Sequence, residues 1–205
     1  MGIADKLPDA HEEYKNLPWI QLEIVSRQEW GALPPKSVEE FDSFPIRDVL
    51  MSYTETDKCE DKESCIKMMQ ELQQKHMSEG EPDIRFSYVV GWDERVYEGR
   101  GFRTKTGANP RYPWLQGKSV EVALSGQRGE VPRPGEKTAI MYRLLDIHSF
   151  DNGPISFKDQ KIVLDYEEPS YVDDNKLLAI VQDCNNWTRP LREEVAGMYH
   201  AVWGE

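Results

Sequence analysis

The strongest constraint on the fold is the alternation of strand-like and helix-like segments along the chain. An apolar run over residues 47–54 ends in polar side chains, and an amphipathic segment with apolar residues at helical spacing follows over 63–79. Residues 84–99 then have the pattern of a β-hairpin, and residues 119–125 have the pattern of another strand. Because helices are interspersed with strands, the sequence predicts an α/β fold in which helices flank a sheet.

The two ends of the chain carry weaker patterns. Residues 1–21 mix Pro, Asp, Glu and Lys without periodicity and are predicted to be an amino-terminal arm. Residues 22–205 are predicted to form a single domain, with a late strand near 161–166. The further helices expected in this domain span residues 136–148, 174–185 and 190–202.

The charge of the chain excludes some classes of partner. Its 25 Lys and Arg against 37 Asp and Glu give a net charge of 25 − 37 = −12, which repels nucleic-acid phosphates and anionic lipid headgroups. No stretch approaches the roughly 18 consecutive apolar residues of a membrane-spanning helix. The first residues lack the apolar region of a secretory signal, so we expect either a cytoplasmic chain or one from which a leader or anchor is missing. We expect no nucleic-acid partner and no membrane span in this chain.

The sequence carries no signature of a common catalytic, metal or cofactor site. Neither a GxSxG elbow nor a GxxxxGK[ST] phosphate loop occurs, and no HExxH pair is present. Acidic residues are so frequent that paired carboxylates carry little information, and Asp83, Glu94 and Glu98 are interpreted as solvated residues of the hairpin. His76 is assigned to the apolar face of its helix. The motifs therefore predict no cofactor and no metal site.

The cysteine content also limits the fold. Three cysteines are too few for a disulfide-built scaffold or for a four-ligand zinc site. Cys59 and Cys65 are close enough to form a local bridge, and their spacing equally allows two reduced, buried thiols. Cys184 falls in the helix expected over 174–185. Asn186 begins Asn-Trp-Thr, a glycosylation acceptor if the chain enters the secretory pathway.

Several segments together resemble the peptidoglycan recognition proteins, in the same order along the chain. They are Ile-Val-Ser-Arg-Gln-Glu-Trp-Gly-Ala over 24–32, the spacing from Cys59 to Cys65, the stretch from Met-Gln to His-Met over 69–77, Asp-Ile at 83–84, and Val-Tyr-Glu-Gly-Arg-Gly-Phe over 96–102. The resemblance is clear over residues 23–126 and weak after about 150. It implies a mixed central sheet flanked by helices, as in type 2 amidases, a groove that holds a muramyl peptide, and a Cys59–Cys65 disulfide.

The resemblance also implies where amidase members of this family hold their zinc. In those members a zinc ion activates water to cleave the bond between N-acetylmuramic acid and L-alanine. The family strand that ends in His-His-Thr ends here in Ser52, Tyr53 and Thr54. A serine hydroxyl is a poor zinc ligand, since imidazole and thiolate are what the ion favours.

Other positions of the family's amidase site are altered as well. The Tyr of the motif Asp-Ile-Gly-Tyr-Asn-Phe matches Phe86, which has no hydroxyl to donate. The His of Gly-Ala-His matches Asn109. The late Gly-His-Arg, which supplies a second zinc ligand, has no counterpart, and the nearest strand ends in Leu-Asp-Tyr-Glu over 164–167.

Basic side chains near the implied groove allow two opposite interpretations. Arg85 stands where the family has Gly, and Arg103 and Lys105 lie in a loop that is one residue longer than usual. A guanidinium could hold a carboxylate of a diaminopimelic-type stem peptide through two hydrogen bonds. Alternatively, these side chains fill or block the groove, or stay solvated. The candidate ligand-groove residues are Ser52, Tyr53, Thr54, Arg85, Phe86, Phe102, Arg103 and Asn109.

The sequence therefore predicts a non-catalytic member of this family, without a metal, that acts in innate immune recognition or its regulation. Its expected partner is a muropeptide or peptidoglycan fragment, or another peptidoglycan-recognition domain. A second interpretation is a protein-interaction module with a closed groove that binds no peptidoglycan, and an active zinc amidase is the interpretation that the residues argue against. The resemblance implies an extracellular location, secreted or as an ectodomain, and a cytoplasmic one is the alternative.

Overall fold

A computed structural model describes residues 22–128, 140, 144–145, 148, 153–156 and 161–165. The expected arm over 1–21 and the expected helices over 174–185 and 190–202 lie outside the described residues, as do Cys184 and Asn186. Of the helix expected over 136–148, the described positions Ile140, Leu144 and Leu145 are helical and buried.

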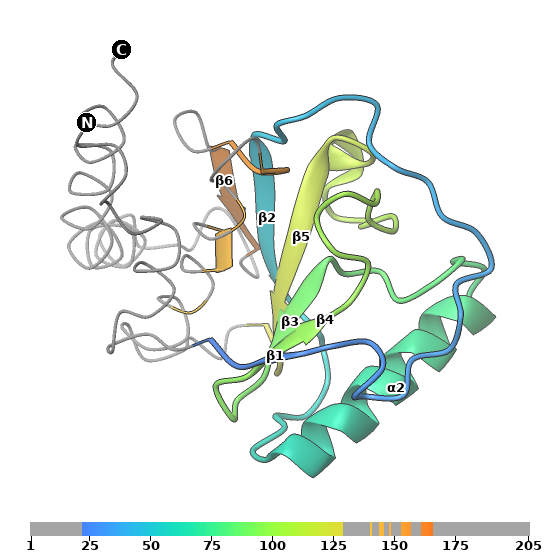
Figure 1. Cartoon of the computed structure of the whole chain (residues 1–205), viewed down its shortest axis with the longest axis vertical. Coiled ribbons are helices and arrows are strands. Elements are labelled where there is room, and N and C mark those ends of the chain that lie inside the picture. Colours follow the sequence, from blue (N-terminus) through green and yellow to red (C-terminus); the bar gives the residue numbers. More distant parts are fainter. Residues whose placement is uncertain are drawn as a thin grey trace, which may run out of the picture.

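A six-stranded mixed sheet lies at the centre of the described part (Figure 1). In space the strands follow the order β1-β4-β3-β5-β2-β6; β3 and β4 are antiparallel, and every other neighbouring pair is parallel. The predicted α/β class and its mixed central sheet are confirmed. The strands are β1 (Ile24–Val25), β2 (Asp48–Tyr53), β3 (Tyr88–Val90), β4 (Val96–Glu98), β5 (Ser119–Leu124) and β6 (Lys161–Leu164).

The ranges predicted from the apolar patterns of the sequence agree with the observed strands and hairpin. Strand β2 falls within the predicted run 47–54, and β5 falls within 119–125. The predicted hairpin is present, with Val90 paired to Val96 and Tyr88 paired to Glu98. Glu94 is exposed at its turn and adopts the left-handed conformation with φ 68°.

Helix α2 (Lys62–Ser78) covers part of one face of the sheet (Figure 1). It begins at a capping box, in which the Asp61 carboxylate accepts from the backbone N–H of Ser64 at 2.7 Å and the Ser64 hydroxyl accepts from the Asp61 backbone N–H at 3.2 Å. Its apolar stripe points to the sheet, and His76 is buried on that stripe as predicted. Among the described residues, no helix is both long and apolar enough to cross a bilayer.

The sheet is buried on both faces, as is usual where parallel strands predominate. On the face of α2, Val89 and Ala123 pack against Met69 of the helix. On the opposite face, Val122 packs in a cluster that includes Leu144. All six residues of β5 are buried, and because side chains alternate along a strand, Glu121 projects to the same face as Ala123.

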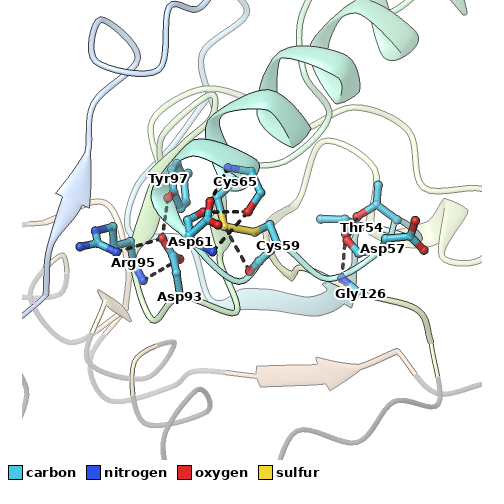
Figure 2. Close-up of a disulfide and its surroundings, with 11 residues drawn as sticks. Thr54, Asp57, Cys59, Asp61, Cys65, Asp93, Arg95, Tyr97 and Gly126 are labelled. Carbon is cyan, nitrogen blue, oxygen red and sulfur yellow. Dashed lines mark hydrogen bonds and ion pairs between the residues drawn. A yellow bond between two sulfur atoms is a disulfide. The ribbon is translucent and has the colours of Figure 1, made fainter.

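A disulfide joins Cys59 and Cys65, with Cα atoms 4.8 Å apart (Figure 2). It ties the loop after β2 to the first turn of α2, and both cysteines are buried. Beside it, the Tyr97 hydroxyl donates to the Asp93 carboxylate at 2.8 Å. The bridge that the family resemblance implies is therefore confirmed.

The interpretation of Asp83 as a solvated hairpin residue is wrong. Asp83 is buried, and its carboxylate accepts from the Gln73 amide at 2.7 Å and pairs with the Arg27 guanidinium at 3.0 Å. The same carboxylate accepts from its neighbour's backbone N–H, that of Ile84, at 2.8 Å. Glu98 is half-buried and accepts from the backbone N–H of Arg27. These contacts connect the segment after β1 to the hairpin. The sequence pattern of the hairpin alone does not predict them.

Candidate functional site

Two side chains that sequence reasoning did not link meet on the α2 face of the sheet. The Ser52 hydroxyl on β2 donates to Oε1 of Glu121 on β5 at 2.6 Å. Ser52 is 2% exposed and Glu121 is 1% exposed. The strand register explains the contact, because Ser52 pairs with Ala123 and Glu121 lies two residues before it on the same face.

Two further candidate residues converge on the same oxygen atom. The Asn109 amide donates to Glu121 Oε1 at 3.1 Å, and a terminal guanidinium nitrogen of Arg85 lies 3.6 Å from it. Ser52, Asn109 and Arg85 come from β2, from the loop before β5 and from the segment before β3. We call these four residues the Glu121 cluster.

The backbone of Arg85 is held from two sides. Its N–H donates to Nδ1 of His76 on α2 at 3.1 Å, and its carbonyl accepts from the N–H of Gly107 at 3.0 Å. A Cβ atom at Gly107 would lie 2.6 Å from the Arg85 side chain, so only glycine lets the loop approach this closely. The guanidinium carbon lies 4.6 Å from the centre of the Phe86 ring. The backbone of Arg85 is therefore fixed, and its guanidinium lies against the Phe86 ring and beside Glu121.

Burial and charge act in opposite directions on the Glu121 carboxyl. Burial raises its pKa above the usual range for glutamate, and the nearby Asp165 carboxylate acts in the same direction. The Arg85 charge and the hydrogen bonds from Ser52 and Asn109 lower the pKa and offset part of this effect. Burial outweighs them, because the pKa remains raised.

The His76 ring beside the cluster is held neutral. Burial lowers its pKa to about 4, and the positive charge of Arg85 acts in the same direction. Since Nδ1 accepts a hydrogen bond from the Arg85 backbone, the proton of the neutral ring is assigned to Nε2.

A second buried acid stands next to Ser52. Asp165 follows β6 directly, and its N–H donates to the Met51 carbonyl at 2.8 Å. Its carboxylate accepts from the Tyr112 hydroxyl at 3.0 Å and pairs with Nε of Arg111 at 3.2 Å and with Nε of Arg128 at 3.4 Å. The loop between β4 and β5 thus contacts both buried acids, through Asn109 at Glu121 and through Arg111 and Tyr112 at Asp165.

The remaining groove candidates lie apart from the Glu121 cluster or are buried beneath it. Phe86 is fully buried, with its ring 5.5 Å from that of His76. Thr54 is buried and its hydroxyl accepts from the N–H of Gly126 at 3.1 Å. Tyr53 is half-buried and packs against the core on the face away from α2.

Phe102, Arg103 and Lys105 do not join the cluster either. Phe102 is buried in the core on the face away from α2, with its ring 4.7 Å from that of Tyr88. Arg103 is exposed and its guanidinium lies 5.2 Å from the Phe44 ring centre. Lys105 pairs with Glu39 at 2.6 Å. Of the basic residues considered in the sequence, only Arg85 therefore reaches the cluster.

The residues at this position do not fit a zinc ion. Zinc in proteins is bound by thiolate, imidazole or carboxylate groups, and Ser52 offers a hydroxyl whose hydrogen is already donated to Glu121. Within the described residues, no group of three or more His, Cys, Asp or Glu side chains is placed to hold a metal ion.

The fold and this site define an α/β domain of the type 2 amidase kind, and comparisons with known proteins identify its family. Peptidoglycan-recognition protein LB of Drosophila melanogaster is 37% identical over 112 residues, which cover 53% of this chain and 47% of that protein. The solved structure of wild-type Drosophila PGRP-LB matches with a TM-score of 0.62 at 30% identity, over 70% of this chain and 82% of that one. A PGRP-LB variant with Tyr replaced by Phe, solved in complex with tracheal cytotoxin, matches with a TM-score of 0.60 at 32% identity, over 69% and 81% of the two chains.

The chain belongs to the peptidoglycan recognition protein family. No general family model matches it. The chain spans about half the length of the curated relatives it matches.

Proposed function

We propose that this protein is a non-catalytic peptidoglycan recognition protein that acts in innate immune recognition or its regulation, by binding a muropeptide or a related receptor domain. Family membership supports recognition of peptidoglycan or a related immune role. The observation that carries the non-catalytic part is the 2.6 Å hydrogen bond from Ser52 to Glu121. This bond occupies the Ser52 hydroxyl inside the protein, and Ser52 matches the position at which amidase members have a zinc-binding His.

The chemistry of the replacement residues agrees with this proposal. A neutral hydroxyl that donates to a buried carboxylate neither binds zinc well nor activates water at neutral pH. Phe86 stands where amidase members have the Tyr that assists the reaction, and its ring offers no hydrogen-bond donor. One relative was solved with tracheal cytotoxin bound, in a variant in which Tyr is replaced by Phe.

Calorimetric titration of the full chain with Lys-type and diaminopimelic-type muropeptides tests the proposed binding. Dissociation constants in the micromolar range or tighter support it. Zinc bound at one ion per chain, together with cleavage of the muramyl amide, would contradict the non-catalytic part.

A specific observation favours a second candidate, a module with a closed groove that binds protein and no peptidoglycan. Ser52, Thr54, Phe86, Phe102 and Asn109 are each at most 8% exposed. A ligand would reach few of these side chains directly. The same titration separates the two candidates, because micromolar binding of a muropeptide contradicts a closed groove.

A further inference from the structure

Three neighbouring parallel strands, β5, β2 and β6, end at the same edge of the sheet (Figure 1). The segments that follow them, residues 126–128, residues 54–56 and Asp165, therefore lie close together at this edge. In open α/β sheets, ligands bind outside the carboxyl ends of the strands. Ser52 lies one residue before the end of β2, so a ligand that approaches it from this edge meets these segments first.

Arg128 connects the three segments through its side chain. Its guanidinium pairs with the Glu55 carboxylate at 2.6 Å, and its Nε lies 3.4 Å from Oδ2 of Asp165. Its backbone N–H also donates to the Glu55 carboxylate at 3.4 Å. The loop before β5 joins the same contacts, because Arg111 and the Tyr112 hydroxyl reach the other oxygen of Asp165. We call Arg128, Glu55 and Asp165 the latch.

The latch is tightest at its outer end, where solvent can reach it. The side chain of Asp165 is 2% exposed, that of Arg128 is 21% exposed and that of Glu55 is 37% exposed. Within the described residues, Nε of Arg128 is buried and forms no hydrogen bond, so its contact with Asp165 is an ion pair alone. The short contact with Glu55 is the one that water and salt weaken. Loss of the Glu55 contact therefore opens the latch from the outside.

The backbone of Glu55 is strained while the latch is closed. Its φ angle is 56°, in the left-handed region that few side chains other than glycine adopt. Its N–H donates to the Gly126 carbonyl at 3.0 Å, and the Gly126 N–H donates to the Thr54 hydroxyl at 3.1 Å (Figure 2). Such strain persists only where the surrounding contacts impose it. Release of the Glu55 side chain removes one of these contacts and favours a second, relaxed conformation of the loop.

We propose that Arg128 is an autoinhibitory latch, which holds the segments after β2, β5 and β6 closed beside Ser52 until its contact with Glu55 is broken. This inference rests on the proposed muropeptide-binding function and adds a regulation of that site. The burial of Ser52 and Thr54 belongs to the latched conformation. A muropeptide binds the open conformation, so its apparent affinity is reduced by the fraction of molecules that are open.

Hydrogen exchange tests the latch without a ligand. Glu55→Gln removes one charge and keeps the side-chain shape, whereas Arg128→Gln weakens the contacts with both acids. We expect the amide hydrogens of Glu55 and Gly126 to exchange about two- to fivefold faster in both variants, the effect of one partly exposed ion pair. Glu71→Gln, on α2, and Arg47→Gln make the same charge changes at exposed side chains and should leave this exchange unchanged.

Titration with the Lys-type and diaminopimelic-type muropeptides tests the regulation. A weaker latch raises the fraction of open molecules, so we expect Glu55→Gln to bind about two- to fivefold more tightly than the unmodified protein. Arg128→Gln should bind up to about tenfold more tightly, because it weakens both ion pairs. The two control variants should bind as the unmodified protein does.

Each result supports or overturns a stated claim. Unchanged exchange in Glu55→Gln and Arg128→Gln overturns the latch, as does faster exchange with unchanged or weaker binding, and both results leave the proposed function standing. If Arg128→Gln does not fold, as judged by circular dichroism, Glu55→Gln and Glu71→Gln decide the question. Binding that is gained only in the latch variants supports the latch and contradicts a permanently closed groove. Absence of binding by the unmodified protein and by both latch variants overturns the proposed muropeptide function, and the proposed regulation with it.

Discussion

The Ser52 hydroxyl lies 2.6 Å from Oε1 of Glu121, and both side chains are buried on the same face of neighbouring parallel strands. By the family resemblance, Ser52 matches a position at which amidase members hold zinc, and in this protein its hydroxyl is a hydrogen-bond donor to a buried acid. Ser52 and Glu121 belong to a polar network that includes Asn109 and Arg85. Such a network fixes the side chains around it when every member has a partner.

Removal of the Ser52 hydroxyl should destabilise the protein. In Ser52→Ala, the buried Glu121 carboxyl loses its shortest hydrogen bond, and we expect the free energy of unfolding to fall by about 1–3 kcal/mol. Urea denaturation followed by tryptophan fluorescence measures this change. Ser43→Ala, at an exposed serine, is the matched control and should stay within about 0.5 kcal/mol of the unmodified protein. Equal stability of the two variants would mean that the Ser52 contact is energetically unimportant.

His76 should make the stability depend on pH in a defined window. Its folded-state pKa is lowered to about 4 from the ordinary 6.5, so between these values the unfolded chain binds a proton that the folded protein does not. The folded protein therefore has its full stability from this residue above pH 6.5, and it loses that part of its free energy of unfolding as the pH falls toward 4. It amounts to at most about 3 kcal/mol, at 1.36 kcal/mol for each pKa unit.

The variant His76→Asn isolates this contribution, because an amide oxygen can still accept from the Arg85 N–H and does not titrate in this range. Urea denaturation at several pH values between 4 and 7 should show a shallower loss of stability in the variant than in the unmodified protein. Parallel curves for the two proteins would show that His76 does not titrate on unfolding.

The disulfide should stabilise the fold by a modest amount because it closes a short loop. The cysteines are six residues apart, and the loop-closure entropy of such a loop corresponds to about 2 kcal/mol. We expect the double variant Cys59→Ala/Cys65→Ala to lose roughly that free energy of unfolding. Reduction with dithiothreitol should lower the melting temperature of the unmodified protein only. A reductant effect of the same size on the double variant would contradict this assignment.

Asp83 should matter far more than the exposed acid at the hairpin turn. Asp83→Ala removes the buried carboxylate that pairs with the Arg27 charge and accepts from Gln73, and we expect a loss of about 3 kcal/mol. Glu94→Asn is the control, since asparagine tolerates the left-handed backbone conformation at that position. Chemical denaturation of both variants measures the difference. Similar, small losses would restore the interpretation of Asp83 as a solvated residue.

Local patterns in the sequence predict the elements of this fold better than the contacts between them. Helix α2 and strand β2 have periodic apolar residues, and the hairpin has a clear turn, so each is visible within a short window. Glu121 was missed because alternation in Ser-Val-Glu-Val-Ala-Leu suggests a solvated face. It is buried because β5 lies between parallel neighbours on both sides and is covered on both faces.

The Glu121 cluster also depends on strand order, which no single segment encodes. Ser52 and Glu121 are 69 residues apart in the chain, and Asp165 reaches the site only because β6 pairs with β2. The family resemblance identified Ser52, Arg85 and Asn109 as candidates, and the structure brings these three together. One signal available in the sequence is the charged residue within an otherwise apolar strand, which favours a buried and partnered carboxyl over a solvated one.

Incubation of the full chain with zinc and a muramyl peptide, followed by mass spectrometry for released peptide, shows whether this protein cleaves its ligand. We expect the peptide to be recovered intact, with no release above that in a sample without protein, because by the family resemblance Ser52 and Phe86 match positions whose groups the reaction needs. Release of the peptide that requires both the protein and zinc would contradict the claim that this family member recognises its ligand without cleaving it.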